Sequence, residues 1–206
     1  MKRSARSRQW YEKHRSDKFV RQAQADGARS RAVYKLEQID ARDALVKPGM
    51  WVLDLGAAPG GWSQYAARKV GPKGGVIAVD LLEMPPLPDV TFVQGDVCSA
   101  AIQERIQSLV PAGGIGLVLS DMAPNLSGIR SKDEAQGELL GEIVVQAADV
   151  LLKPGGSLLT KAFHGMGFEG LRSALRERFQ SVSVRKPAAS RAQSSEIYLV
   201  AKGHGV

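Results

Sequence analysis

The chain has 206 residues, enough for one domain that buries its own core without disulfides or metal ions. A single cysteine, Cys98, excludes an internal disulfide, and three scattered histidines (His14, His164 and His204) lack metal-ligand spacing, so we expect no metal. No apolar run reaches the roughly 18 residues that cross a bilayer, and the basic start lacks the apolar segment of a secretory signal. We therefore expect a soluble cytoplasmic protein with no membrane partner, and take a monomer as the default.

The net charge of +7 is concentrated at the N-terminus. Residues 1–35 hold eleven Lys or Arg against three acidic residues, whereas the rest of the chain holds 17 basic and 18 acidic residues. Phosphate backbones bind such segments because each neutralised phosphate releases counterions. Trp10, Tyr11 and Phe19 lie within it and can stack on bases or simply pack. The composition predicts a nucleic-acid-binding segment over residues 1–30, with a solvated tail or an organellar transit peptide as alternatives.

The first predicted helix precedes the sheet, over residues 30–45. Apolar residues recur there at helical spacing, and Ser30 is placed to cap the helix. From Met50 onward, short apolar runs alternate with amphipathic stretches. The predicted buried strands are 51–56, 74–80, 90–96, 115–121 and 156–162, and the predicted helices lie near 61–70, 99–109, 134–152 and 167–179.

This alternation predicts an α/β fold, in which a mostly parallel sheet carries helices on both faces. Two strand-like runs, 181–187 and 194–203, follow without a helix between them, so we expect the last strand to be antiparallel to its neighbours. Such sheets bind their ligands at the carboxyl ends of the parallel strands. The residues at that edge therefore matter most for function.

A glycine-rich loop, "LDLGAAPGGW", follows the first strand and opens a helix. It lacks the second glycine, two residues after Gly56, that brings the backbone close to a pyrophosphate, so a dinucleotide is disfavoured. The loop still allows a ligand to approach closely, and S-adenosylmethionine fits. Asp80 ends the next strand, where a carboxylate can meet ribose hydroxyls, and Asp96 follows the third strand, where it can accept from an adenine amino group. Each alone is as often a turn former or helix cap.

Four ionisable residues are predicted to converge beside this loop. Asp121 ends the fourth strand and Lys161 the fifth. Glu196 begins the last strand, which starts at the same edge if it is antiparallel, and Lys35 lies early in the helix that leads to the first strand. Taken singly, each has an ordinary structural explanation, such as a surface charge, a cap or a turn. Together they predict a reacting centre with Lys161 between two carboxylates.

Five motifs carry a family resemblance: "SRAVYKLEQID", "DLGAAPGGWSQY", "SDMAPNLSG", "GGSLLTKAF" and "SRAQSSEIYLVA". They resemble the FtsJ/RrmJ family of ribose 2′-O-methyltransferases over nearly the whole chain. The similarity is strongest to the bacterial form that methylates one uridine of large-subunit ribosomal RNA. It is weakest in the first few residues and in "LLEMPPLPDV", residues 81–90.

The resemblance implies a Rossmann-like fold, a methyltransferase domain over residues 31–206 behind the basic RNA-binding segment, and S-adenosylmethionine as cofactor. It places the family's catalytic tetrad on Lys35, Asp121, Lys161 and Glu196. It places the donor contacts on Gly60, Trp62, Asp80, Asp96 and Asp121. The implied partner is the large ribosomal subunit or its RNA.

The expected reaction attacks a sulfonium methyl group with a ribose 2′-hydroxyl. Lys161 would accept the hydroxyl proton or its hydrogen bond, with Asp121 and Glu196 orienting it and Lys35 steadying the developing oxyanion. Two carboxylates favour a charged Lys161, whereas Lys35 and burial oppose the charge, so both roles stay open. Methylation of transfer RNA, a small-molecule O-methyltransferase and a non-catalytic ribosome-assembly factor are the competing functions.

Overall fold

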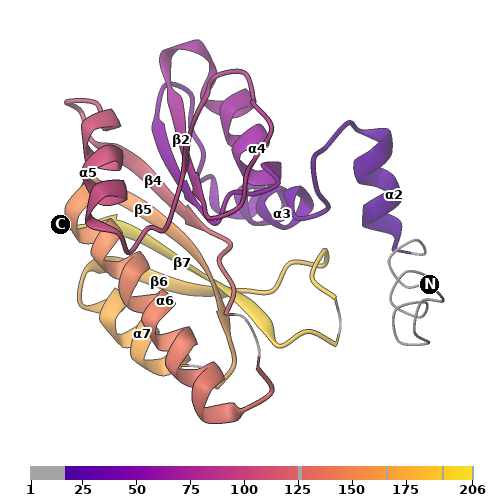
Figure 1. The fold of residues 1–206 in the computed structure, drawn as a ribbon, viewed down its shortest axis with the longest axis vertical. Helices are drawn as coiled ribbons and strands as arrows, with labels where there is room; N and C mark the ends of the chain where they lie inside the picture. Colours follow the sequence, from indigo (N-terminus) through magenta and orange to yellow (C-terminus); the bar gives the residue numbers. More distant parts are fainter. Residues whose placement is uncertain (1–16, 125–126, 166, 192, 206) are drawn as a thin grey trace.

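The computed structural model describes residues 17–124, 127–165, 167–191 and 193–205. One seven-stranded sheet, in the order β3-β2-β1-β4-β5-β7-β6, forms its centre (Figure 1). The strands are β1 (Trp51–Leu55), β2 (Gly75–Asp80), β3 (Val90–Gln94), β4 (Ile115–Ser120), β5 (Leu152–Phe163), β6 (Phe179–Arg185) and β7 (Glu196–His204). Strands β1 to β5 run parallel, and β7 is antiparallel to both β5 and β6. The predicted α/β class and antiparallel last strand are confirmed.

Helices cover both faces of the sheet (Figure 1). They are α2 (Lys18–Ala25), α3 (Val33–Asp43), α4 (Gly61–Val70), α5 (Ala100–Leu109), α6 (Arg130–Leu151) and α7 (Phe168–Arg176), with a short 3-10 turn η1 (Gly71–Lys73) after α4. Helices α3 and α4 pack on one face, where Leu36 and Ala66 meet Leu159 of β5. Helices α5, α6 and α7 pack on the other, where Ile106 and Val144 meet strand residues. Because successive strand side chains point to opposite faces, both layers bury a core.

Three sequence-based boundaries need correction. Ser30 does not cap the first helix of the domain, because α3 begins only at Val33 and its N-terminus has no side-chain cap. Ser30 instead lies against α4, where a Cβ on Gly61 would fall 2.4 Å from the Ser30 Oγ. Strand β5 continues past Lys161 to Phe163, and α6 begins four residues before the predicted residue 134.

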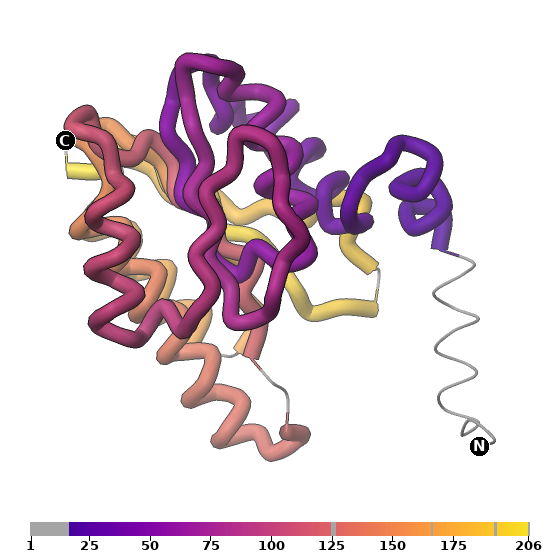
Figure 2. The backbone as a smooth tube through the Cα atoms, turned by 45° about the horizontal axis from the view of Figure 1, so that its top comes forward, coloured from indigo at the N-terminus to yellow at the C-terminus, as the bar shows by residue number. Residues whose placement is uncertain are grey.

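Helix α2 lies at one end of the molecule and the end of β7 at the other (Figure 2). Ala23 of α2 is buried in a small cluster with Val33, Tyr34 and Ala189, and the Phe19 ring lies 5.5 Å from that of Tyr34. Phe19 therefore packs against the domain. Trp10, Tyr11 and the basic residues before position 17 lie outside the described residues, so the proposed division at residue 30 stays a prediction. Within the described ranges, no helix is both long and apolar enough to cross a membrane.

Candidate active site

The four predicted catalytic residues come together at the carboxyl edge of the sheet. Asp121 directly follows β4, and its backbone N–H donates to the Leu55 carbonyl at the end of β1 (3.2 Å). Glu196 opens β7 and pairs with Phe163, the last residue of β5, because the two strands are antiparallel. Lys161 stands two residues before that end, and Lys35 lies in the first turn of α3. The topology thus explains how residues so distant in sequence meet.

Two ion pairs join these four side chains. The Lys35 Nζ lies 2.7 Å from the Glu196 Oε1, and the Lys161 Nζ lies 3.1 Å from the Asp121 Oδ1. The Lys161 ammonium also donates to the backbone carbonyl of Asp121. All four side chains are at most 20% exposed, so solvent screens the pairs less than it screens surface ion pairs.

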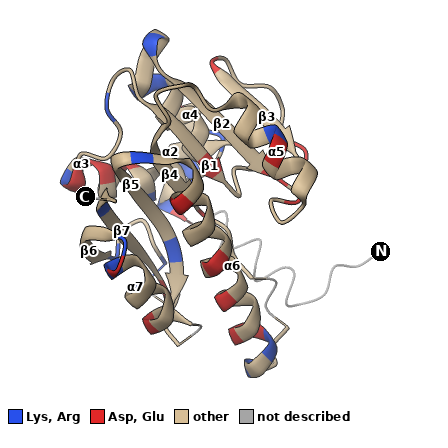
Figure 3. Ribbon diagram, turned by 90° about the vertical axis from the view of Figure 1, so that its left-hand side faces the viewer, with Lys and Arg blue, Asp and Glu red and all other residues tan. Residues whose placement is uncertain are grey.

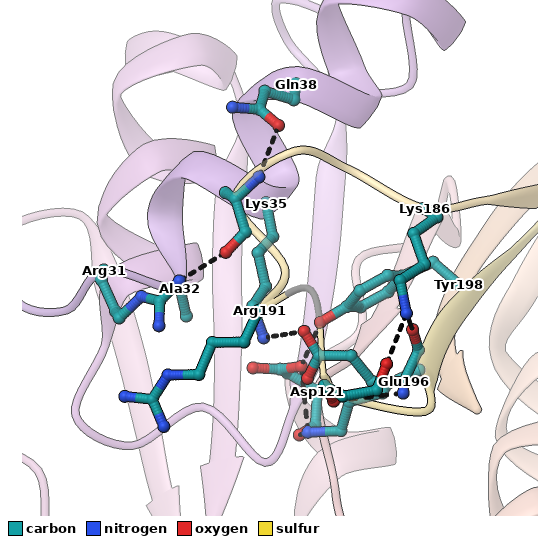
Figure 4. A network of polar contacts seen from close by, with 12 residues as sticks. Arg31, Ala32, Lys35, Gln38, Asp121, Lys186, Arg191, Glu196 and Tyr198 are labelled. Carbon is teal, nitrogen blue, oxygen red and sulfur yellow. Dashed lines mark hydrogen bonds and ion pairs between the residues drawn. The ribbon is translucent and has the colours of Figure 1, made fainter. Parts of the chain in front are cut away.

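Tyr198 connects the two pairs and was not among the predicted site residues. Its hydroxyl donates to the Asp121 Oδ1 at 3.0 Å, and the Lys35 Nζ lies 5.8 Å from the centre of its ring (Figure 4). Tyr198 also pairs directly with Lys161 across β5 and β7. In sequence it stands in an apolar strand and is typical of a core aromatic, so only the tertiary structure reveals its polar contact.

The site perturbs two pKa values in opposite directions. Burial alone would raise the pKa of Glu196, but the hydrogen bond and charge of Lys35, with a further contribution from Lys161, bring that pKa below its usual value. Burial, followed by the charges of Asp121 and Glu196, raises the pKa of Tyr198. At neutral pH, Glu196 is therefore a carboxylate and Tyr198 a neutral hydrogen-bond donor.

The glycine turn, residues 56–61, lies between the end of β1 and helix α4. Gly56 and Gly60 have φ values of 74° and 103°, a region that side chains with a Cβ rarely adopt. A Cβ on Gly56 would fall 2.7 Å from the Met122 side chain, so the turn packs closely on the segment after β4. Asp80 holds the turn to the end of β2, since its Oδ2 accepts from the Ala58 N–H at 2.8 Å.

Asp54 is a second residue absent from the sequence-based site. It is fully buried in β1 beneath the turn, and its Oδ2 accepts from the Ser63 hydroxyl at 2.6 Å. Its other oxygen, Oδ1, has no hydrogen-bond partner among the described residues. Burial, partly offset by Ser63, and the nearby charges of Asp121 and Asp80 raise its pKa to about 7. A lone carboxylate inside an apolar strand was the available sequence signal.

The remaining predicted donor contacts occupy structural positions. The Trp62 side chain is 3% exposed; its indole N–H donates to the Ala32 carbonyl at 2.8 Å, and its ring packs against Tyr198. The Trp62 side chain thus joins α3, α4 and β7. Its backbone N–H lies in the first turn of α4, where backbone N–H groups have no acceptor within the helix and can bind a ligand. Asp96 accepts from the Cys98 N–H at 2.9 Å in the exposed turn before α5.

These residues suit a cationic nucleoside donor. S-adenosylmethionine carries a sulfonium and an ammonium, and carboxylates of Asp54, Asp80, Asp96 and Asp121 lie at or near the carboxyl ends of four adjacent parallel strands. The orphaned buried oxygen of Asp54 is the strongest sign of a missing cationic or hydrogen-bond-donating partner. Within the described ranges, no group of three or more His, Cys, Asp and Glu is arranged to hold a metal.

Basic side chains lie around these predicted site residues (Figure 4). Lys186 donates to the Glu196 carbonyl at 3.0 Å. Arg31 and Arg191 both reach Asp17, at 2.6 and 3.6 Å. Acidic residues instead recur along α6 (Figure 3). Positive charge thus gathers at this edge of the sheet, and such a patch favours the approach of polyanions.

The fold of this chain also occurs in a protein whose solved structure holds S-adenosylmethionine. The solved structure of fibrillarin from Aeropyrum pernix, which contains that donor, shares the fold with a TM-score of 0.58 at 18% identity, over 84% of this chain and 74% of its own. This likeness shows that the two proteins share a fold.

The chain belongs to the FtsJ-like methyltransferase family, which matches residues 28–204. Similar proteins called ribosomal RNA large subunit methyltransferase E occur in Legionella pneumophila, at 47% identity over 100% of both chains, and in Chromohalobacter salexigens, at 51% identity over 98% of this chain and 97% of the relative. A solved ribosomal RNA methyltransferase from Plasmodium falciparum is 29% identical over 85% of this chain and 98% of its own, with a TM-score of 0.77. The predicted family is confirmed.

Proposed function

We propose that the protein transfers a methyl group from S-adenosylmethionine to the ribose 2′-hydroxyl of a uridine in large-subunit ribosomal RNA, within the assembled large subunit. The observation that carries the proposal is the pair of adjacent lysine–carboxylate contacts, Lys35–Glu196 and Lys161–Asp121, beside the glycine turn. A protein that only binds RNA has no need of them. The names of the relatives support ribosomal RNA over transfer RNA.

Lys161 is the proposed centre of the reaction. An ammonium has three N–H donors, and two of those of Lys161 are engaged by Asp121 among the described residues. The third is suited to a substrate hydroxyl, which it can hold in line for attack. When bound, S-adenosylmethionine supplies an electrophilic methyl group. Asp121 fixes the position of Lys161, and Tyr198 fixes that of Asp121.

Lys35 and Glu196 form the second half of the proposed site. Their contact holds a positive charge at the edge of the reacting centre, where it stabilises an oxygen that gains negative charge as its proton leaves. Glu196 stays ionised because Lys35 lowers its pKa. The pH dependence of the rate distinguishes proton transfer to Lys161 from proton transfer to solvent.

The proposed donor contacts are Gly60, Trp62, Asp80, Asp96 and Asp121, to which the structure adds Asp54 as a candidate. The proposed RNA contacts are the basic segment 1–30 and the basic side chains around the site, Arg31, Lys186 and Arg191. Phosphate contacts of this kind make RNA affinity fall steeply with salt concentration. A cytoplasmic location, a monomeric state and a metal-free reaction stay predictions.

Methyl transfer to four RNA preparations tests the proposal: undermethylated large ribosomal subunits, protein-free large-subunit RNA, small ribosomal subunits and transfer RNA. We expect incorporation into large subunits to exceed that into the other three by about a hundredfold, because both shape and sequence select the target. Equal or greater incorporation into transfer RNA would overturn the ribosomal assignment. Preference for protein-free RNA would overturn the assembled-subunit part alone.

A further inference from the structure

The connection between the neighbouring parallel strands β2 and β3, residues 81–89, runs from the carboxyl end of β2 back to the amino end of β3 without a helix or strand. We call it the strap. It contains Pro85, Pro86 and Pro88, which have no backbone N–H. A proline-rich segment must therefore be held largely through its carbonyl oxygens.

Arg29 supplies donors to these carbonyls. Its Nη1 donates to the Pro85 carbonyl and its Nη2 to the Pro86 carbonyl, both at 2.5 Å, and Nη1 also approaches the Pro59 carbonyl at 3.5 Å. One guanidinium thus spans two consecutive residues of the strap and reaches the glycine turn. The planar fork of arginine suits two parallel bonds, which the single ammonium of lysine cannot reproduce.

The strap packs directly on the glycine turn. Met84 is 4% exposed and clusters with Ala57 of the turn and Ala78 of β2. A Cβ on Gly60 would fall 2.8 Å from the Met84 sulfur, 3.0 Å from the Leu87 Cδ1 and 3.2 Å from the Arg29 Cδ. The strap, Arg29 and the turn therefore form one packed unit, and a displaced strap would leave the turn unsupported.

Arg29 is itself fixed to α4, the helix that follows the turn. Its backbone N–H donates to the Gln64 Oε1, and the Gln64 Nε2 donates to the Gly27 carbonyl, both at 3.1 Å. The side chain of Arg29 therefore leaves from an anchored backbone. Because the backbone is already fixed, less conformational entropy is lost when the side chain binds the strap.

We propose that Arg29 is a positioning residue for the methyl donor, which holds the strap against the glycine turn and so preforms the donor pocket. The inference rests on the use of S-adenosylmethionine at this turn and is independent of which RNA is methylated. Arg29 lies in the basic segment 1–30, so the competing role is a contact to an RNA phosphate. The two roles differ in what the side chain does when RNA is absent.

Calorimetric titration of the RNA-free protein with S-adenosylmethionine separates these roles. We expect Arg29→Ala to raise the dissociation constant about tenfold, in line with the loss of charge-assisted hydrogen bonds, and Arg29→Lys to raise it by a similar factor. Arg21→Ala is the matched control, because Arg21 is exposed on α2 of the same basic segment. It should leave donor affinity unchanged.

Amide hydrogen exchange gives a second, activity-independent measure. Exchange at the hydrogen-bonded amides at the two ends of the strap, Leu82 and Val90, should quicken in Arg29→Lys and Arg29→Ala but not in Arg21→Ala. If Arg29→Ala does not fold, calorimetry and hydrogen exchange are both measured on Arg29→Lys. Wild-type donor affinity and wild-type strap exchange in a folded Arg29 variant, with RNA affinity reduced as in Arg21→Ala, would overturn the proposal.

Discussion

Lys161 and Tyr198 face each other across β5 and β7, and their side chains meet at the same oxygen atom. The Oδ1 of Asp121 lies 3.1 Å from the Lys161 Nζ and 3.0 Å from the Tyr198 hydroxyl. The Asp121 carboxylate is therefore fixed by two hydrogen-bond donors. Tyr198 holds it in place, and it in turn holds the flexible side chain of Lys161. The proposed catalytic lysine is thereby held before any substrate arrives.

Lys161→Ala should strongly slow methyl transfer while leaving the binding of S-adenosylmethionine nearly intact. We expect turnover to fall by about a thousandfold, because the hydroxyl loses its positioning group and its proton acceptor or hydrogen-bond donor. Single-turnover kinetics and calorimetry with S-adenosylmethionine measure the two effects. Lys153→Ala, at the exposed beginning of the same strand, is the control. Near-normal turnover in Lys161→Ala would rule out the assigned role.

Tyr198→Phe isolates the hydroxyl contact to Asp121. The ring stays in the core, so the free energy of unfolding should fall by only about 1 kcal/mol. Turnover should fall by about tenfold, because the Asp121 carboxylate, which positions Lys161, loses one of its two hydrogen-bond donors. If both turnover and the affinity for S-adenosylmethionine were unchanged, Lys161 alone would suffice to hold Asp121.

Glu196→Gln should lower the stability of the fold. It leaves the partly buried Lys35 ammonium, whose side chain is 12% exposed, without its anionic partner, which we expect to cost about 1–3 kcal/mol of stability. Glu134→Gln is the matched control. Its partner Arg130 is 89% exposed, and the change should cost less than about 0.5 kcal/mol. Chemical denaturation compares the two variants, and equal losses would mean that the Lys35–Glu196 pair contributes no more than a surface pair.

Asp54 should make folding stability depend on pH. Its pKa is raised from 3.8 to about 7 in the fold, so the native state holds this proton more tightly than the unfolded chain does. The stability that protonated Asp54 contributes is fully present below the pKa of the unfolded state and is lost as the pH rises through the pKa of the folded state. The free energy of unfolding should therefore fall further between pH ~5 and pH ~8 in wild type than in Asp54→Asn. A parallel decline in both proteins would contradict the raised pKa.

The same carboxyl group should couple donor binding to proton release. A cationic donor favours the charged form of Asp54, so below pH ~7 the proton must leave as the donor binds, and affinity should rise with pH up to about that value. Calorimetry in buffers of different ionisation enthalpy counts the released proton. Asp54→Asn should bind the donor without release, and proton release that persists in this variant would assign it to another group.

The mostly parallel sheet, its antiparallel last strand and the edge where the four ionisable residues meet could be predicted, because they follow from alternating patterns and from the rule that parallel strands end at one edge. Lys35, Asp121, Lys161 and Glu196 were located in this way. Tyr198 could not be, because an aromatic residue in an apolar strand looks like core until its cross-strand neighbour is known.

Local signals failed where tertiary contacts decided the outcome. Ser30 looked like a helix cap, yet its hydroxyl lies beside Gly61 of α4 and the helix starts later. Arg29 looked like one more basic residue of an RNA-binding segment. Its contacts to Pro85 and Pro86 join residues more than fifty positions apart, and no sequence pattern links them.

The most direct test of the account is transfer of a radiolabelled methyl group from S-adenosylmethionine to undermethylated large ribosomal subunits, with Lys161→Ala in parallel, followed by alkaline hydrolysis of the RNA. A methylated 2′-hydroxyl blocks cleavage of the adjacent bond. The account predicts label in an alkali-resistant dinucleotide from the wild-type protein alone. Label released in mononucleotides, or equal labelling by Lys161→Ala, would contradict ribose methylation centred on this lysine.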